Sequence, residues 1–342
     1  MKNEDLSGIS KRFLAFAKDC EGSSELYHSL SLKVAQDEDL LRIAQMSHAG
    51  QPEPNMLFGV VHWLLLQGKS HALGRYYPSI DVNFEKPKDA YPSFRMFALE
   101  NSSEILPLLQ KHLVQTNEVQ RCAYLLPAIL TAGQYFEGRG ISVIELGASA
   151  GLNLLWDYYR YQYDNEEPVG LLESSLTINC KWQGDNRPNL TGLFPEIKSR
   201  IGIDLSPIEV KDFGQMSWLQ ALIWPEHFDR RVRLSKAVKI ALDNPVHMVE
   251  GDAVSVLPDI LDEVHPSIVP FVYHTWVANQ MNPQQREQLL QIIDTFGQKR
   301  DIVHIHTNIE PHLHATIYRS GERIDLPLAI VDGHARWIEW LT

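Results

Sequence analysis

The chain has 342 residues, of which 44% are hydrophobic and 22% charged, as expected of a soluble globular protein with one large α/β domain plus an extension, or two domains. Lys and Arg number 31 against 43 Asp and Glu, and the resulting net charge of −12 disfavours nucleic acid and membranes as partners. The three cysteines form no C-x-x-C pair, and the N-terminus lacks the apolar segment of a signal peptide. A cytoplasmic protein is therefore expected.

The first 138 residues have the apolar spacing of helices. Leu, Ile, Phe and Ala recur every three or four residues, which is the period of one helix face. The pattern breaks at 52–54 and 77–92, which we predict as loops. A helical cap region over 1–138 is expected. Its predicted helices span 10–20, 25–35, 56–67, 94–114 and 118–136.

From residue 141 short β-branched runs alternate with amphipathic helical stretches, which predicts βαβ units and a mainly parallel sheet over 139–342. After about 312 the period becomes two, with turns at 320–321 and 332–333, so an antiparallel hairpin is expected there. Residues 160–199 break the alternation and are predicted to be an insertion over one edge of the site. The predicted strands are 141–146, 200–204, 246–249, 268–273 and 301–306, and the predicted helices are 149–159, 213–223, 228–242, 252–262 and 282–296.

This predicted order, a Rossmann-like α/β sheet with an antiparallel hairpin at its C-terminal end, is the architecture of class I methyltransferases. Architecture alone does not assign a function, because one fold hosts many activities. The function has to be argued from the residues at the ends of the strands.

The segment "ELGASAGLN" after the first predicted strand fits two chemistries. Its G-x-S-x-G pattern matches the elbow that presents a nucleophilic serine, here Ser149, in α/β-hydrolases. From Glu145 it is also one substitution from the acidic, glycine-rich first loop of nucleotide-cofactor folds, with Gly147, Ser149 and Gly151 in the turn. A hydrolase would need several strands and an oxyanion loop before the serine, and neither is predicted.

Two further acids support the cofactor interpretation. Asp204 ends the second predicted strand of the alternating region, where a carboxylate binds ribose hydroxyls in nucleotide-binding folds. Asp252 ends the third, like the acid that methyltransferases use near the adenine amino group. Either aspartate alone is also explained as a helix N-cap. The interval from Glu145 to Asp204 is much longer than the usual spacing of about 20 residues, which the insertion accounts for.

Four ordered motifs make the chain similar to a known family. They are "QTNEVQRCAYLLPAI" (115–129), "ELGASAGLNLLWDYYRYQY" (145–163), "GIDLSPIEV" (202–210) and "WPEHFDRRVRLSKA" (224–237). They resemble the bacterial proteins grouped as domain of unknown function 2332, from about residue 90 to residue 310. The resemblance implies a fold related to class I methyltransferases, without a reaction or a substrate, and the family motif itself has serine at position 149.

Several polar residues are candidates for the acceptor side of such a site. Asn117 and Arg121 start a predicted helix, where capping is the alternative role. Trp224 and Arg231 offer stacking and bidentate hydrogen bonds to a planar or acidic molecule, or form a solvated helix face. His274, at the tip of the fourth predicted strand, is a candidate general base or a packed core histidine.

The segment "HIHTNIEPHLH" (304–314) contains two H-x-H pairs. On a strand each pair shares one face, so His304 with His306, or His312 with His314, could bind zinc with help from Glu310. Scattered surface and core histidines are the favoured interpretation, and no metal is expected.

The sequence thus predicts S-adenosylmethionine as cofactor and methyl transfer to a small, anionic or planar molecule. Glu145, Gly147, Ser149, Gly151, Asp204 and Asp252 are expected to bind the cofactor. A non-catalytic sensor or scaffold on the same fold is the alternative, and a serine hydrolase is the third possibility.

Overall fold

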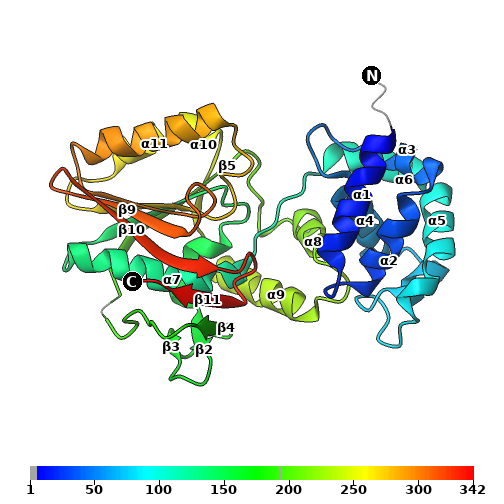
Figure 1. The fold of residues 1–342 in the computed structure, drawn as a ribbon, viewed down its shortest axis with the longest axis horizontal. Coiled ribbons are helices and arrows are strands. Elements are labelled where there is room, and N and C mark those ends of the chain that lie inside the picture. Colours follow the sequence, from blue (N-terminus) through cyan, green and yellow to red (C-terminus); the bar gives the residue numbers. More distant parts are fainter. Residues whose placement is uncertain (1–5, 193) are drawn as a thin grey trace. The chain divides into compact units, whose positions relative to one another are not determined.

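The computed structural model describes residues 6–192 and 194–342, which form two compact units (Figure 1). The helical unit comprises the chain up to Thr116 together with 212–232, and the α/β unit comprises 117–211 and 233–342. The segment 117–138, grouped with the helical region on sequence grounds, therefore packs in the α/β unit. Conversely, residues 212–232 leave the α/β rhythm and complete the helical unit.

The helical unit packs its helices around an aromatic core. Phe58 lies at its centre, with the ring of Phe13 edge-on at 5.7 Å and the ring of Tyr27 stacked at 4.7 Å. The predicted helix 94–114 is two helices divided at Asn101, and 38–44 is an additional helix. None of the described helices is both long and apolar enough to cross a bilayer. The α-helices are α1 (Leu6–Cys20), α2 (Glu25–Val34), α3 (Glu38–Ala44), α4 (Glu53–Leu66), α5 (Tyr91–Glu100), α6 (Ser102–Lys111) and α8 (Phe213–Ala221).

The α/β unit is built on a single mixed sheet. Its strand order is β3-β2-β4-β11-β10-β9-β8-β7-β1-β5-β6, and the block from β8 to β6 is parallel. Strands β8 to β11 form the antiparallel meander expected from the period-two pattern. The strands are β1 (Ile141–Leu146), β2 (Arg160–Tyr163), β3 (Val169–Gly170), β4 (Thr177–Gln183), β5 (Ile197–Asp204), β6 (His247–Glu250), β7 (Val269–His274), β8 (Ile302–His306), β9 (Leu313–Arg319), β10 (Glu322–Val331) and β11 (Trp337–Trp340).

Helices cover both faces of this sheet (Figure 1). Helix α7 (Cys122–Gly133) lies on one face, and α10 (Ala253–Glu263) and α11 (Pro283–Gly297) lie on the other. The α10/α11 face is apolar at its centre, where Ile144 and Val272 of the sheet pack with Leu289. The boundary between the two units falls within α9 (Phe228–Asp243).

The helix predicted at 149–159 is wrong as an α-helix. Residues Leu152–Tyr158 form a short 3-10 segment, η5, whose helical geometry is interrupted at Leu155. The reason is local competition for carbonyl groups. The hydroxyl of Tyr159 donates to the Leu152 carbonyl at 2.6 Å, and the guanidinium of Arg200 donates to the Leu154 carbonyl at 2.6 Å. Side chains thus take acceptors that an α-helix would use.

The insertion 160–199 does not lie over one edge of the site, as predicted, but extends the sheet. Strand β4 pairs in parallel with β11, and β2 pairs in parallel with β4. The unpaired edge of β11 is thereby covered, which is how sheets avoid exposing open backbone groups.

Candidate functional site at the carboxyl edge of the sheet

The strand order of the parallel block reverses between β1 and β7. From β1 the chain runs outward through β5 to β6, and then returns to β7 and β8 on the other side of β1. In open α/β sheets ligands bind outside the carboxyl ends of the strands at this reversal. Glu145, Asp204 and His274 lie at or next to the ends of β1, β5 and β7, so the fold brings these three predicted residues to one edge.

The turn after β1 has three residues in the left-handed region. Gly147, Ser149 and Gly151 have φ values of +68°, +54° and +69°. A Cβ atom on Gly147 would lie 2.4 Å from a methyl group of Val277. Gly147 is therefore required both by its φ and by the close approach of the segment after β7. Ser149 adopts the same region without being a glycine, which is uncommon and costs backbone energy.

Asp204 holds this turn in place. Its Oδ2 atom accepts a hydrogen bond from the Ser149 N–H at 2.8 Å, and its Oδ1 atom accepts from the Ser206 N–H at 2.9 Å. A carboxylate oxygen has two lone pairs and can accept more than one hydrogen bond. Asp252 is the N-cap of α10, where it accepts from the Ser255 N–H at 3.1 Å. The capping role weighed for Asp252 is the one that the structure shows.

Glu145 is buried in β1 and faces helix α7. Only 2% of the residue is exposed, and its Oε1 atom accepts from the Asn153 amide at 3.1 Å. The Asn153 amide oxygen lies 3.4 Å from Cys122 Sγ, which completes a buried chain of three polar groups. The Oε2 atom of Glu145 has no hydrogen-bond partner among the described residues. Burial raises the pKa of Glu145 to about 8, with a further increase from Asp204 and a decrease from the Asn153 hydrogen bond.

The hydroxyl of Ser149 is also buried without a partner in the part of the chain that the structure describes. The residue is 5% exposed. A hydrolytic serine is hydrogen-bonded to a base, usually a histidine. Among residues 6–192 and 194–342 no such bond to Ser149 Oγ is present.

Asn117 and Arg121 approach the same edge from the segment before α7. The side-chain oxygen of Asn117 accepts from the Leu152 N–H at 3.1 Å, which fixes the end of the turn. Arg121 donates to the Thr275 carbonyl at 3.3 Å and lies over the ring of Trp276 at 5.8 Å. Arg121 is thus next to the residue that follows His274.

His274 is fully buried on the opposite face from Glu145. Strand pairing sets Glu145 beside Tyr273, and side chains alternate along β7, so His274 points toward the α10/α11 face. Burial lowers its pKa to about 4, and neither ring nitrogen has a hydrogen-bond partner among the described residues. The imidazole is therefore neutral at pH 7. Three further histidines adjoin it, as described below.

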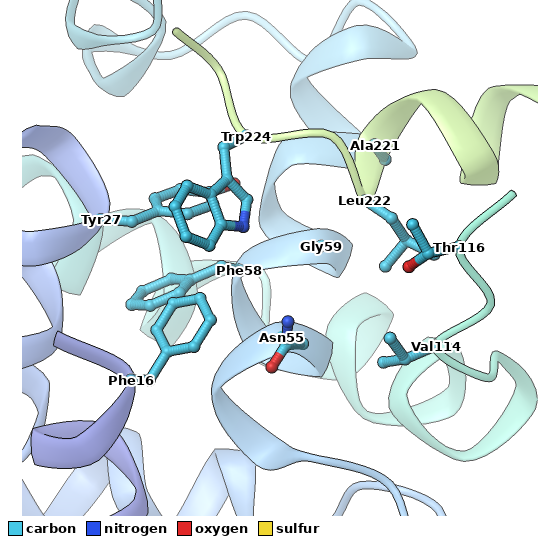
Figure 2. A pocket seen from close by; sticks show the side chains of 10 residues that line it. All are labelled: Phe16, Tyr27, Asn55, Phe58, Gly59, Val114, Thr116, Ala221, Leu222 and Trp224. Carbon is cyan, nitrogen blue, oxygen red and sulfur yellow. The ribbon is translucent and has the colours of Figure 1, made fainter. Parts of the chain in front are cut away.

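Trp224 and Arg231 belong to the helical unit. The Trp224 ring packs edge-on against Phe16 at 5.6 Å and against Tyr27 at 6.3 Å, in the aromatic group shown in Figure 2. It lines a cavity of about 20 Å³, which has room for about one water molecule and not for a planar ligand. Burial lowers the pKa of Arg231. These two residues therefore lie in a different compact unit from the turn at 145–151.

Sequence reasoning missed Asn153 and Thr275. Asn153 is a single polar residue within an apolar run, and its full burial with a bond to Glu145 is the kind of polar network that a sequence does not reveal. Its only signal was its position two residues after the glycine-rich turn. Thr275 follows His274 directly, and its carbonyl oxygen accepts a hydrogen bond from the Arg121 guanidinium.

The strand reversal and the left-handed turn define the class of fold. The α/β unit is a Rossmann-like doubly wound sheet, with polar side chains gathered at the carboxyl edge. The chain belongs to the family described as uncharacterized protein conserved in bacteria (DUF2332), whose model matches residues 10–340. Among curated proteins, none matches this chain.

Proposed function

We propose that the α/β unit binds S-adenosylmethionine at the turn 145–151 and transfers its methyl group to a small anionic or planar molecule. One observation carries the proposal: a buried carboxyl group, Glu145, has an unpartnered oxygen beside a glycine-rich turn at the strand reversal. A buried polar atom without a partner costs free energy unless a ligand or water satisfies it.

The charges of this edge favour a cationic, phosphate-free cofactor. The carboxylate of Asp204 would repel a pyrophosphate. Burial raises the pKa of Glu145 to about 8, so Glu145 is mostly protonated at pH 7, and a bound cation would stabilise its carboxylate form. The segment after the turn, η5, is a short interrupted 3-10 piece, so it lacks the helix N-terminus that binds phosphates in dinucleotide folds. The sulfonium and ammonium groups of S-adenosylmethionine would favour the carboxylate form of Glu145, and its ribose hydroxyls can donate hydrogen bonds to the carboxylate of Asp204.

When bound, the cofactor supplies an electrophilic methyl group, which needs alignment more than acid–base help. The residues of the chain would provide that alignment. Glu145 would release its proton and bind a cationic group, Asp204 would accept from a ribose hydroxyl, and the left-handed turn from Gly147 to Gly151 would present its backbone to the cofactor. On the acceptor side, His274 is neutral at pH 7, and because burial lowers its pKa to about 4 its role there would be to hydrogen-bond the methyl acceptor rather than to take up a proton. Asp252 is already a helix cap, and its adenine-binding role rests on position alone.

Calorimetry with S-adenosylmethionine and S-adenosylhomocysteine tests the proposal. Binding heat and a thermal shift are expected for the wild type and for Ser149→Gly, whereas Ser149→Leu fills the approach path and should bind neither. Ser320→Leu is the matched control, because Ser320 is an exposed serine with a similar φ of +53°. No heat and no thermal shift in the wild type would remove the methyltransferase proposal and leave the sensor or scaffold with another ligand.

A serine hydrolase is the second candidate, and the left-handed φ of Ser149 favours it. The unpartnered Ser149 hydroxyl argues against it. A fluorophosphonate probe separates the two candidates. Labelling of the wild type that is lost in Ser149→Ala would establish the hydrolase and overturn the cofactor site.

A further inference from the structure

Four histidines stand side by side on the α10/α11 face of the sheet. His274 ends β7, His304 and His306 lie in β8, and His314 lies in β9. The strand register pairs His306 with His274 on one side and with His314 on the other. Because paired residues and every second residue of a strand point to one face, all four rings emerge from the same face. We call these four residues the histidine cluster.

Each of the four rings adjoins at least one other ring of the cluster. The ring centroids of His304 and His306 are 4.7 Å apart, and those of His274 and His304 are 5.2 Å apart. The rings of His274 and His306 lie nearly parallel, at 17° and 5.7 Å, and His306 is 5.3 Å from His314. His306 therefore touches each of the other three.

The cluster is buried, and its polar atoms are unsatisfied. His274 and His304 are 0% exposed and His306 is 2% exposed, whereas His314 is only partly buried and forms the outer side. Both ring nitrogens of His274 and of His304, and the Nδ1 atoms of His306 and His314, lack hydrogen-bond partners among the described residues. A neutral imidazole has one donor and one acceptor nitrogen, and buried polar groups in native proteins are nearly always paired.

The spacing of the rings favours a hydrogen-bonded oxygen over a metal ion. In the described part of the chain, no three His, Cys, Asp or Glu side chains are arranged to hold a metal ion. Nitrogen ligands of zinc lie about 2.0–2.1 Å from the ion, so they must converge closely. Nitrogen donors to an oxygen lie about 2.9 Å from it and are therefore farther apart from one another. Rings that adjoin without converging suit the second case.

We propose that the histidine cluster binds the oxyanion group, a carboxylate or a phosphate, of a small-molecule ligand. Neither ring nitrogen of His274 or of His304 hydrogen-bonds to another described residue. Each ring can therefore carry its proton on whichever nitrogen faces the oxyanion and donate a hydrogen bond from it. The cluster lies at the carboxyl ends of β7 and β8, where doubly wound sheets bind ligands. This inference deepens the proposed function, since it names the anionic group of the acceptor, and it rests on that function for the ligand's identity only.

The surrounding charges make this binding dependent on pH. Desolvation and the neighbouring rings lower the pKa of His304 and bring that of His306 to about 2, so the empty cluster is uncharged at pH 7. Arg323 also lowers the pKa of His304 and of His314, whereas Asp325 and Glu310 act in the opposite direction on His314, and His312 lowers it further. A bound oxyanion stabilises imidazolium, so binding takes up protons. If one proton is taken up, the affinity rises about tenfold for each pH unit lowered.

Nuclear magnetic resonance of the ring nitrogens in the full chain, labelled with ¹⁵N-histidine, tests this inference. Inorganic phosphate and propionate are titrated separately at pH 6 and pH 8, at constant ionic strength. We expect the resonances of the cluster to shift with at least one anion and at lower concentration at pH 6. A response to phosphate alone or to propionate alone supports the inference and identifies the oxyanion.

Variants separate the cluster from the rest of the unit. His306→Leu should weaken anion binding at least about tenfold, because the central donor of a charge-assisted group is lost. His247→Leu, at an exposed histidine of β6, should leave it unchanged. No shift with either anion, or equal shifts in His306→Leu and wild type, would overturn the inference in favour of buried waters. Stoichiometric zinc uptake that is lost in His306→Leu would overturn it in favour of a metal centre.

The same titrations distinguish this inference from the proposed cofactor site. Ser149→Leu is expected to lose S-adenosylmethionine binding and to keep the anion response. If the wild type binds the anion and does not bind S-adenosylmethionine, the oxyanion site stands and the methyl-transfer proposal falls. If it binds S-adenosylmethionine only, the histidine cluster is not an anion site.

Discussion

The two faces of the sheet treat their buried polar groups differently. On the α7 face Glu145, Asn153 and Cys122 are linked to one another, with one carboxyl oxygen left over. On the α10/α11 face each of the four histidines adjoins His306 or is His306 itself, and six of their ring nitrogens are unpartnered in the described chain. The polar groups on the α7 face stabilise one another through hydrogen bonds, whereas the histidine nitrogens can be satisfied only by a ligand or by water. Removing a hydrogen-bonding group from the first set should therefore cost more stability than removing one from the second.

The two faces also respond to pH with opposite signs. The pKa of Glu145 is raised from 4.5 to about 8, so the folded state binds a proton that the unfolded state has released. Its stabilising contribution is complete below pH 4.5 and is lost as the pH rises to about 8. The pKa of His274 is lowered from 6.5 to about 4, so its contribution is complete above pH 6.5 and is lost as the pH falls toward 4.

Glu145→Gln should have the largest effect on this comparison. Gln keeps a side-chain oxygen for the Asn153 amide and carries no charge at any pH. Relative to the wild type, the variant should gain stability between pH 4.5 and pH 8 by on the order of 5 kcal/mol, because each unit of pKa shift is about 1.4 kcal/mol. Urea unfolding across this range measures it. Parallel stability curves for the two proteins would contradict a raised pKa at Glu145.

Gly147→Ala should disturb both faces of the sheet, because Gly147 follows β1, and β1 contributes side chains to both faces. A positive φ and a Cβ contact of 2.4 Å with Val277 should together lower the free energy of unfolding by about 2–4 kcal/mol. Gly138→Ala is the matched control, since Gly138 has a φ of +79° and no atom near its added Cβ. Equal losses in both variants would show that only the φ matters and that Val277 yields.

Asn153→Ala should break the linked set on the α7 face. It leaves Glu145 without its one hydrogen bond and removes the acceptor near Cys122, so a loss of about 1–3 kcal/mol in the free energy of unfolding is expected. Asn179→Ala, at an exposed asparagine of β4, should change stability by less than about 0.5 kcal/mol. A loss no greater than that of the control would mean that the three groups do not support one another.

His306→Leu should have the smallest effect at neutral pH, within about 1 kcal/mol, because apolar replacement of an unpaired buried group is close to neutral. Below pH 6.5 the His306 ring is protonated in the unfolded state and uncharged in the folded state, so lowering the pH reduces the free energy of unfolding of the wild type. The variant should be more stable than the wild type by up to about 2 kcal/mol at pH 5. Acid unfolding measures this, with His247→Leu as control. An unchanged acid midpoint would contradict the lowered pKa of His306.

Periodicity predicted the α/β unit well because its strands are buried and its helices amphipathic. Strand β1 was predicted at its observed bounds, and the meander after residue 312 was confirmed. The predicted helix after β1 was wrong because the side chains of Tyr159 and Arg200 donate to its carbonyls, and Arg200 lies outside the predicted helix, in β5. Likewise, no pattern within 160–199 could show that β4 pairs with β11, more than 150 residues later.

The candidate site was predicted in part. Glu145, Ser149 and Asp204 were selected from a short motif and a strand end, and the structure brings them to one edge. Trp224 and Arg231 were grouped with them only because their residue types suit an acidic ligand, and the structure assigns them to the helical unit. The H-x-H segment was set aside because sequence does not show that strand register adds His274 to it.

The position of β11 between β10 and β4 has a consequence for synthesis of the chain on the ribosome. Strands β2, β3 and β4 lie near the middle of the sequence and are translated more than 150 residues before β11, yet they pair with the rest of the sheet only through residues 337–340. Until those residues emerge, about half of the molecule's translation time passes with a tyrosine-rich strand group that has no docked edge. During that interval chaperones or a neighbouring nascent chain can bind the edge of β4 that later pairs with β11. Pairing of β11 with β4 is therefore a late step of co-translational folding.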